Sequence, residues 1–196
     1  MKRIFRDNPL IVASIALPLL VIILFAAATI IPRLTTPPPQ HDLLLVEKHG
    51  NPAAGLPMQV TVAVKEGRVV MVFNDKQEWQ TIALPRVYLY NPRSASAIEV
   101  ELPEPDNWDE ISNGYYLPVP ALEARRVVTT NLAPDGYEYR GYRHGGGLML
   151  DLFGGGRSKA VSISKDGAIY RVELPTDAPY WGPRAEFLGW IVEQER

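Results

Sequence analysis

No cysteine occurs among the 196 residues of the chain. This absence excludes disulfide bonds, zinc sites built on thiolates, CxxCH haem attachment, thiol catalysis and a lipid-modified N-terminal cysteine. The sequence also lacks an Asn-x-Ser/Thr acceptor for N-glycosylation with a permitted middle residue. An exported domain with neither feature is more typical of a bacterial envelope than of an animal cell surface.

Charge is absent from the stretch Asn8 to Pro32, whose core from Leu10 to Ile31 is apolar. These residues, as a helix with a rise of about 1.5 Å per residue, would span roughly 33 Å, and the hydrocarbon core of a bilayer is about 30 Å thick. A segment in lipid must satisfy its backbone hydrogen bonds internally. We therefore predict a single transmembrane helix over residues 9–32, with a kink at Pro18.

Basic residues are unevenly distributed around this segment. Lys2, Arg3 and Arg6 precede it, whereas Arg33 alone follows it closely. The positive-inside rule then places residues 1–8 in the cytoplasm as a short tail, and the C-terminal domain in the periplasm or outside the cell. The predicted location is the bacterial inner membrane.

A cleaved signal peptide is the alternative interpretation of the same segment. Small residues at 26–28 offer a cleavage site, but the apolar run continues beyond them to Ile31. It is also longer than the apolar region of about 7–15 residues that signal peptides usually have. We favour a retained anchor, and both interpretations export the domain.

Residues 33–41 contain three successive prolines, which favour an extended polyproline II spacer. The domain that follows, residues 42–196, is mildly acidic, because 16 basic and 21 acidic side chains come after Arg33. Nucleic-acid binding rests on neutralising phosphates, so no nucleic acid is expected as a partner.

Short apolar runs separated by turn residues fill the rest of the chain. Residues 58–64 alternate apolar and polar side chains, and Glu66-Gly67 can turn them back into residues 69–73. Similar hairpins are predicted for residues 86–90 with 97–102, and around Asp166-Gly167. We predict an all-β domain, a sandwich or a barrel, over residues 42–196.

Motifs for catalysis and metal binding are also missing. The chain has no Gly-x-Ser-x-Gly, no HExxH and no calcium loop, and its second glycine triplet lacks the lysine of a Walker motif. The histidines, His41, His49 and His144, lie outside any known motif. We predict no catalytic residue, no metal site and no cofactor, and favour a protein that is not an enzyme.

A proline-rich loop at residues 103–116 is long for a compact domain, and such loops are often functional. It carries four acids and three aromatic residues: Glu104, Asp106, Asp109, Glu110, Trp108, Tyr115 and Tyr116. The acids could be a solvated loop or could surround a hard cation, and the aromatic rings could stack on sugars.

A second candidate region runs from residue 137 to 157. It begins with alternating tyrosines, Tyr137, Tyr139 and Tyr142, followed by His144. Two glycine triplets then enclose an apolar run that includes Leu148, Leu150 and Phe153. This run is either a hinge-flanked core segment or an apolar flap that docks a partner or the membrane surface. A ligand or metal carrier around His144 is a further possibility.

The layout resembles bacterial inner-membrane proteins with a short tail, one helix, a proline spacer and a β-rich periplasmic domain, such as secretion-system linkers and cell-division proteins. Such a resemblance in layout assigns no residue roles. We therefore expect a non-enzymatic binding or assembly partner in the bacterial envelope. The alternative is an exported carbohydrate-active or sugar-binding protein that uses the acidic and aromatic residues of the 103–116 loop. The predicted partner surface comprises Trp108, Tyr115, Tyr116, Tyr137, Tyr139, Tyr142, His144, Leu148, Leu150 and Phe153.

Overall fold

A computed structural model of the chain describes residues 9–47, 56–75, 84–105, 107–141, 161–175 and 185–192. The chain forms two compact units. The first holds Met1–Pro38 and Lys165–Ile169, and the second holds Pro39–Ser164 and Tyr170–Arg196. The two units are described separately below.

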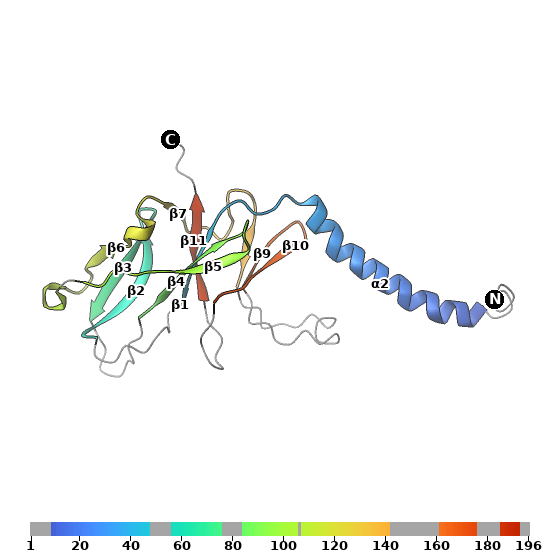
Figure 1. Ribbon diagram of the computed structural model, residues 1–196, viewed down its shortest axis with the longest axis horizontal. Coiled ribbons are helices and arrows are strands. Elements are labelled where there is room, and N and C mark those ends of the chain that lie inside the picture. The colour runs from blue at the N-terminus through green and yellow to red at the C-terminus, as the bar shows by residue number, and fades with distance from the viewer. Residues whose placement is uncertain are drawn as a thin grey trace. The chain divides into compact units, whose positions relative to one another are not determined.

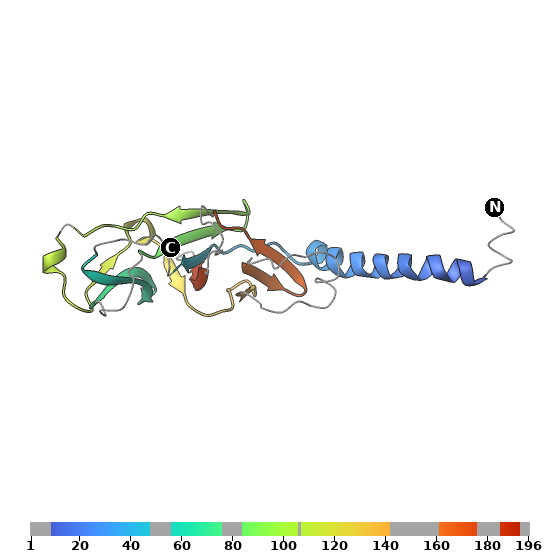
Figure 2. The same cartoon turned by 90° about the horizontal axis from the view of Figure 1, so that it is seen from below.

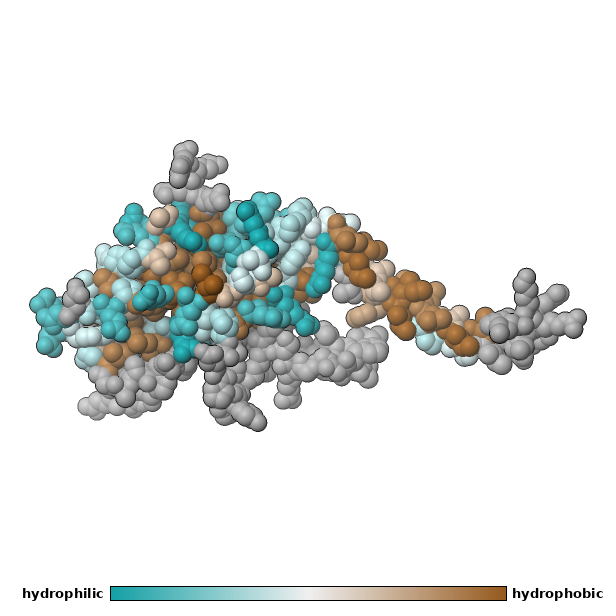
Figure 3. Space-filling view, viewed as in Figure 1, coloured by the Kyte–Doolittle hydropathy of each residue, from teal (hydrophilic) through white to brown (hydrophobic). Residues whose placement is uncertain are grey.

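A single helix, α2 (Pro9–Thr35), dominates the first unit. Its stretch Val12–Thr35 is 24 residues long and apolar enough to cross a membrane, and none of its described side chains is buried. Figure 3 shows this apolar surface as a nearly continuous brown band. The helix ends at Thr35, three residues beyond the predicted end. After it, the backbone N–H of Thr36 still donates to the Pro32 carbonyl over 2.9 Å. In the same unit, Arg33 Nη2 donates to the carbonyl of Ile169 over 3.0 Å.

The second unit is built from antiparallel strands (Figure 1). A central sheet has the order β5 (Ser96–Val100), β4 (Arg86–Asn91), β1 (Leu43–Glu47), β11 (Ala185–Val192) and β7 (Arg126–Val128). A second sheet has the order β2 (Met58–Lys65), β3 (Arg68–Asp75) and β6 (Tyr116–Pro118). A third has the order β10 (Ala168–Val172), β9 (Val161–Lys165) and β8 (Glu138–Arg140), and the turn that joins β9 to β10, Lys165–Ile169, is counted with the first unit.

The prediction of a β-rich fold with one apolar N-terminal helix is confirmed. The finer prediction of a sandwich or a barrel is not confirmed, because the strands form three sheets that do not close on themselves over the described residues. Residues 185–192 form the last strand of the domain.

Glycine-containing turns set the register of two predicted hairpins. Glu66 and Gly67 both have positive φ, 52° and 76°, and so do Asp166 and Gly167, 47° and 85°. This is the pattern of a type I′ turn, whose twist matches that of the strands it joins. In the hairpin of β4 and β5, Asn91 Oδ1 instead accepts hydrogen bonds from the backbone N–H groups of Arg93 and Ser94 in the turn.

The middle of the central sheet, at β1 and most of β4, is buried on both faces. On β1, Leu44 and Val46 point into one apolar cluster, and Leu43 and Leu45 point into another. The first cluster includes side chains of the β2–β3–β6 sheet, and the second includes side chains of β9 and β10. Figures 1 and 2 show β2 and β3 on one side of the central sheet, and β9 and β10 on the other. This arrangement explains why β1 is a continuous apolar run: neither of its faces meets water.

A bulge on β11 decides which core receives its largest side chain. Leu44 pairs with Gly189 but the next residue, Leu45, pairs with Phe187, so the register shifts at Leu188. An extra residue reverses the alternation of side chains along a strand. As a result Trp190, which simple alternation places on the same face as Leu188, lies in the second cluster.

Candidate binding groove

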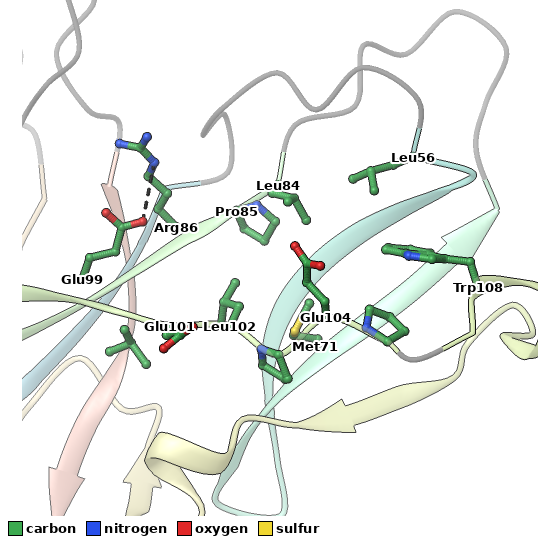
Figure 4. A pocket seen from close by; sticks show the side chains of 13 residues that line it. Leu56, Met71, Leu84, Pro85, Arg86, Glu99, Glu101, Leu102, Glu104 and Trp108 are labelled. Carbon is green, nitrogen blue, oxygen red and sulfur yellow. Dashed lines mark ion pairs between the residues drawn. The ribbon is translucent and has the colours of Figure 1, made fainter.

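The described residues enclose a groove of about 340 Å³ on the second unit. It lies where β4 begins and β5 ends, and the proline-rich segment after β5 forms one wall (Figure 4). The lining residues are Leu56, Met71, Leu84, Pro85, Arg86, Glu99, Val100, Glu101, Leu102, Pro103, Glu104, Pro105 and Trp108.

The floor of the groove is apolar and continuous with the first core. Met71 on β3 and Val100 on β5 are both buried. Leu84, Leu102 and Trp108 are partly buried and pack against the same core. These side chains offer an apolar surface that a ligand can reach without unfolding the domain.

Trp108 is held in position by its surroundings. Its ring meets Phe73 edge to face, with 5.8 Å between the ring centroids. Asn107 caps the short turn that follows, because its Oδ1 accepts from the Asp109 N–H over 3.1 Å and its Nδ2 donates to Glu110 over 2.8 Å. Asparagine favours such turns because its side chain hydrogen-bonds the backbone nearby. The turn therefore presents the indole as a fixed wall of the groove.

Charges along the groove are mainly negative. Glu99, Glu101 and Glu104 line it, against the single basic side chain of Arg86. Arg86 Nε lies 3.7 Å from a carboxylate oxygen of Glu99, so these two groups form an ion pair. Figure 4 shows the carboxylate of Glu104 inside the groove, on the side of Leu84 and Leu56. Two carboxylates thus remain without a basic neighbour among the lining residues.

A buried polar network lies next to Arg86. The Tyr88 hydroxyl donates to Glu47 over 3.3 Å, and Glu47 is only 8% exposed. A hydrogen bond with Tyr88 and the nearby charge of Glu99 raise the pKa of Arg86 above its ordinary value. Burial raises the pKa of the Tyr88 hydroxyl, which stays protonated at neutral pH. Arg86 is therefore a permanent charge in a fixed place.

The residues of the predicted partner surface lie in separate parts of the structure. Trp108 lines the groove, whereas Tyr115 and Tyr116 are exposed by 45% and 54% on the neighbouring strand and its approach. Tyr115 packs against Phe73 with 6.0 Å between centroids. Tyr116 has the Lys65 ammonium 4.4 Å from its ring centroid.

The other tyrosines of the predicted surface belong to a different part of the unit. Tyr137 is 1% exposed and packs edge to face against Tyr170 in the second core. Tyr139 is partly buried, with its ring 4.9 Å from that of Phe187. These two are not brought together with Trp108. The remaining members of the predicted surface lie outside the described residues: Tyr142, His144, Leu148, Leu150 and Phe153.

The acids of the 103–116 loop do not gather in the described part of the chain. No three carboxylate or histidine side chains there lie close enough together to hold a metal ion. Glu110 accepts from Asn107, while Glu104 faces the groove, and Asp106 is not among the described residues.

Several groove residues were missed from the sequence. Arg86 and Met71 were expected within strands, and Glu99 and Glu101 on the outer face of a hairpin, so none of the four was singled out as a site residue. The register of the hairpin pairs Tyr88 with Glu99 and Val87 with Val100, which the Asn91 turn could have predicted. What the turn does not predict is the position of Trp108, which comes from a separate segment and closes the groove.

Comparison with known proteins returns no match: no family model, no curated protein and no solved structure is significantly similar to the chain.

Proposed function

We propose that this protein is a single-pass anchored β-domain that binds another protein of the bacterial envelope and performs no catalysis. The observation that carries the proposal is the groove, whose buried apolar floor and fixed indole wall are open to a ligand. The helix Val12–Thr35 supports attachment to a membrane. The uneven basic flanks support a cytoplasmic N-terminus and a periplasmic or extracellular domain.

The groove has the features of a protein-binding surface more than those of an enzyme site. Interfaces are enriched in aromatic residues, methionine and arginine around an apolar centre, and Trp108, Met71 and Arg86 supply these types here.

Photo-crosslinking in living cells tests the binding role. A photoreactive amino acid replaces Glu104, which lines the groove, or Ile98, which is exposed beside it. Replacement of the exposed Glu123 gives the matched control. We expect Glu104 and Ile98 positions to capture one defined envelope protein that the Glu123 position does not. If neither groove position captures a protein, although both variants are present at the normal level, the proposal is contradicted.

Cysteine accessibility tests the orientation. Because the chain has no cysteine, Ser94→Cys in the exposed hairpin turn is the single thiol of the variant. We expect a membrane-impermeant maleimide to label it in intact spheroplasts. Labelling only after lysis would place the domain in the cytoplasm and overturn the proposed location.

Carbohydrate binding is the second candidate, because one feature of the 103–116 loop favours it. The groove brings Trp108 and the Glu104 carboxylate together, and sugar sites combine an aromatic platform with acidic groups. Binding or hydrolysis of envelope glycans that is lost in both Trp108→Ala and Glu104→Gln, and kept in Glu123→Gln, would favour it over the protein-binding role.

A further inference from the structure

We infer that the turn between β9 and β10, Lys165–Ile169, is a second lipid-contacting surface, which lies in the headgroup layer of the membrane that α2 enters. In this position the end of the helix and the turn present two exposed apolar side chains, Leu34 and Ile169, to lipid. The partner is the bilayer surface itself, so this contact is distinct from the protein-binding groove. The inference rests on one part of the proposed function, the membrane-spanning helix, and needs no envelope partner.

The first observation is that the turn packs against the C-terminal end of α2. Both belong to the first compact unit of the chain. Arg33 Nη2 donates to the carbonyl of Ile169 over 3.0 Å, although the two residues are 136 positions apart. A Cβ placed on Gly167 would lie 3.4 Å from both Cβ and Cγ of Pro32, which is van der Waals contact. The turn therefore lies directly beside the end of the helix.

The second observation is the depth that this end of the helix reaches in a bilayer. The uncharged core from Leu10 to Ile31 spans roughly 33 Å as a helix, or about 31 Å with an average tilt of about 20°. It therefore fills a hydrocarbon layer of about 30 Å, and the headgroups add about 5–8 Å on each side. Pro32 and Arg33 then lie among the headgroups. A turn in contact with Pro32 lies at the same depth.

The third observation is that apolar side chains at this depth are exposed. Leu34 is 79% exposed and Ile169 is 44% exposed, whereas their neighbours Thr36 and Ala168 are buried. Single exposed apolar residues are common on protein surfaces, but these two flank the end of a membrane span. Apolar side chains of surface-bound segments enter the boundary between headgroups and acyl chains. Lipid therefore supplies the cover that these two side chains lack.

The charges across the helix end and the turn fit a headgroup layer. Arg33 and Lys165 are basic and Asp166 is acidic, which leaves one net positive charge. Lysine and arginine suit this layer because their stems cover apolar surface while their charged ends meet water and lipid phosphates. Asp166 is exposed, so its carboxylate can stay hydrated. No charge here has to enter the hydrocarbon layer for the turn to touch the bilayer.

The main test places a fluorescent label on single cysteines, because the chain has none of its own. Ile169→Cys reports the turn, Leu34→Cys the helix end, and Glu123→Cys an exposed position of the second unit. Each labelled full chain is reconstituted in phosphatidylcholine vesicles that contain a lipid with a nitroxide quencher. One vesicle series carries the nitroxide on the headgroup, and another carries it near the top of the acyl chain.

The expected pattern follows from placing Leu34 and Ile169 in one layer. Since that layer is about 5–8 Å thick, quenching at Ile169 should be within about twofold of quenching at Leu34 for both lipids. It should be about threefold or more stronger than quenching at Glu123. Quenching at Ile169 no greater than at Glu123 overturns the inference. Quenching of Ile169 by the headgroup nitroxide alone overturns the apolar contact with lipid.

A disulfide tests the packing of the turn on the helix without any lipid label. The 3.4 Å between Pro32 Cβ and an added Cβ on Gly167 is close to the separation of about 3.5–4.5 Å in disulfides. We expect Pro32→Cys/Gly167→Cys to form this bond on mild oxidation, seen as altered migration in a non-reducing gel. The control pair Pro32→Cys/Glu123→Cys should stay reduced. Failure of the first pair, when each single variant is present at the normal level, contradicts the packing.

A label inside the helix separates failure of this inference from failure of the proposed anchoring. Ile22→Cys lies within the apolar span, and its label should be quenched by a nitroxide deep in the acyl chains. If Ile22 is quenched and Ile169 is not, the inference about the turn is wrong and the anchor stands. If Ile22 is not quenched, the proposed anchoring is wrong and the inference falls with it. Capture of an envelope protein at the groove is measured independently of both.

Discussion

Gly189 lies on β11 at a position where a side chain has no room. A Cβ at this position would collide with Cγ1 of Val127 and would lie 2.9 Å from the carbonyl oxygen of Val128, both on β7. Its φ is not in the left-handed region, so the backbone itself accepts an L residue. The effect of Gly189→Ala therefore reports packing between β11 and β7 and not backbone strain.

Two opposing contributions determine the expected magnitude. Replacing glycine by alanine at a compatible position stabilises a protein by about 0.4–1 kcal/mol, because the unfolded chain loses freedom. Overpacking of a core costs about 1–3 kcal/mol, and here one obstacle is a backbone carbonyl within a paired strand that cannot rotate away. We expect Gly189→Ala to be destabilised by about 2 kcal/mol, which is a fall in Tm of about 4–8 °C for a chain of this size.

The assay is urea and thermal unfolding of the full chain in detergent micelles, followed by tryptophan fluorescence. Trp190 is adjacent to the substitution and buried, so its emission reports the same region. The second half of the design is the Val127→Ala background, where one of the two obstructing groups is absent. Gly189→Ala should cost about 1 kcal/mol less there than in the wild-type chain, because only the Val128 carbonyl still obstructs it.

Gly114→Ala is the matched control. Gly114 has φ +81°, and an added Cβ would meet no heavy atom of the described residues within 4 Å, so the substitution introduces backbone strain alone. It should destabilise the protein to the same extent with and without Val127→Ala. Stabilisation by Gly189→Ala, or strict additivity of Gly189→Ala with Val127→Ala, would refute the close packing of β11 on β7.

The remaining predictions concern the polar network, the turns and high pH. Tyr88→Phe removes the donor to the buried Glu47 carboxylate, so we expect a loss of about 1–3 kcal/mol in urea unfolding. Burial raises the pKa of both Tyr88 and Tyr90 above their usual 10.0, so the unfolded chain releases these protons first as pH rises. The free energy of unfolding should not depend on these two groups below about pH 10, and it should fall as the pH rises from 10 through the raised pKa values of the folded state. A Tyr88→Phe/Tyr90→Phe chain should show a smaller fall. An identical fall would contradict the raised pKa of these tyrosines. Asn91→Ala removes the acceptor of two turn N–H groups and should lower stability by about 0.5–2 kcal/mol, with Asn91→Asp close to wild type. Gly67→Ala places a side chain at φ +76° and should cost about 1 kcal/mol in the same assay, and no loss would argue against the type I′ turn.

Much of the local structure could be predicted from the sequence because it depends on neighbouring residues. The alternation over residues 58–64 predicted β2, and the Glu-Gly and Asp-Gly pairs predicted the two turns that the structure contains. The acidic, proline-rich segment after β5 was predicted as a long loop, but its last residue, Tyr116, begins β6, which pairs with β3. β6 has only three residues, a tyrosine, a leucine and a proline. This is too short for an alternation of apolar and polar side chains to be recognised in the sequence.

Much of the candidate site could not be predicted, because it depends on residues far apart in the chain. Trp108 and the 103–116 loop attracted attention as an aromatic and acidic segment. Their relation to Met71 and Arg86 required the packing of β3 beneath β4 and β5. Tyr137 illustrates the opposite case, since a tyrosine in a turn-rich segment looks exposed but fills the second core.

The sequence by itself determined that one apolar helix precedes a β-rich domain, and where its clearest hairpins turn. Those features follow from residue type and short-range spacing, which act the same way in any fold. Only the tertiary structure decided that β1 is buried on both faces, that a bulge at Leu188 sends Trp190 to the second core, and that the end of β5 opens into an acidic groove. Each of these depends on which strands become neighbours, and that choice is made by the packing of the whole domain.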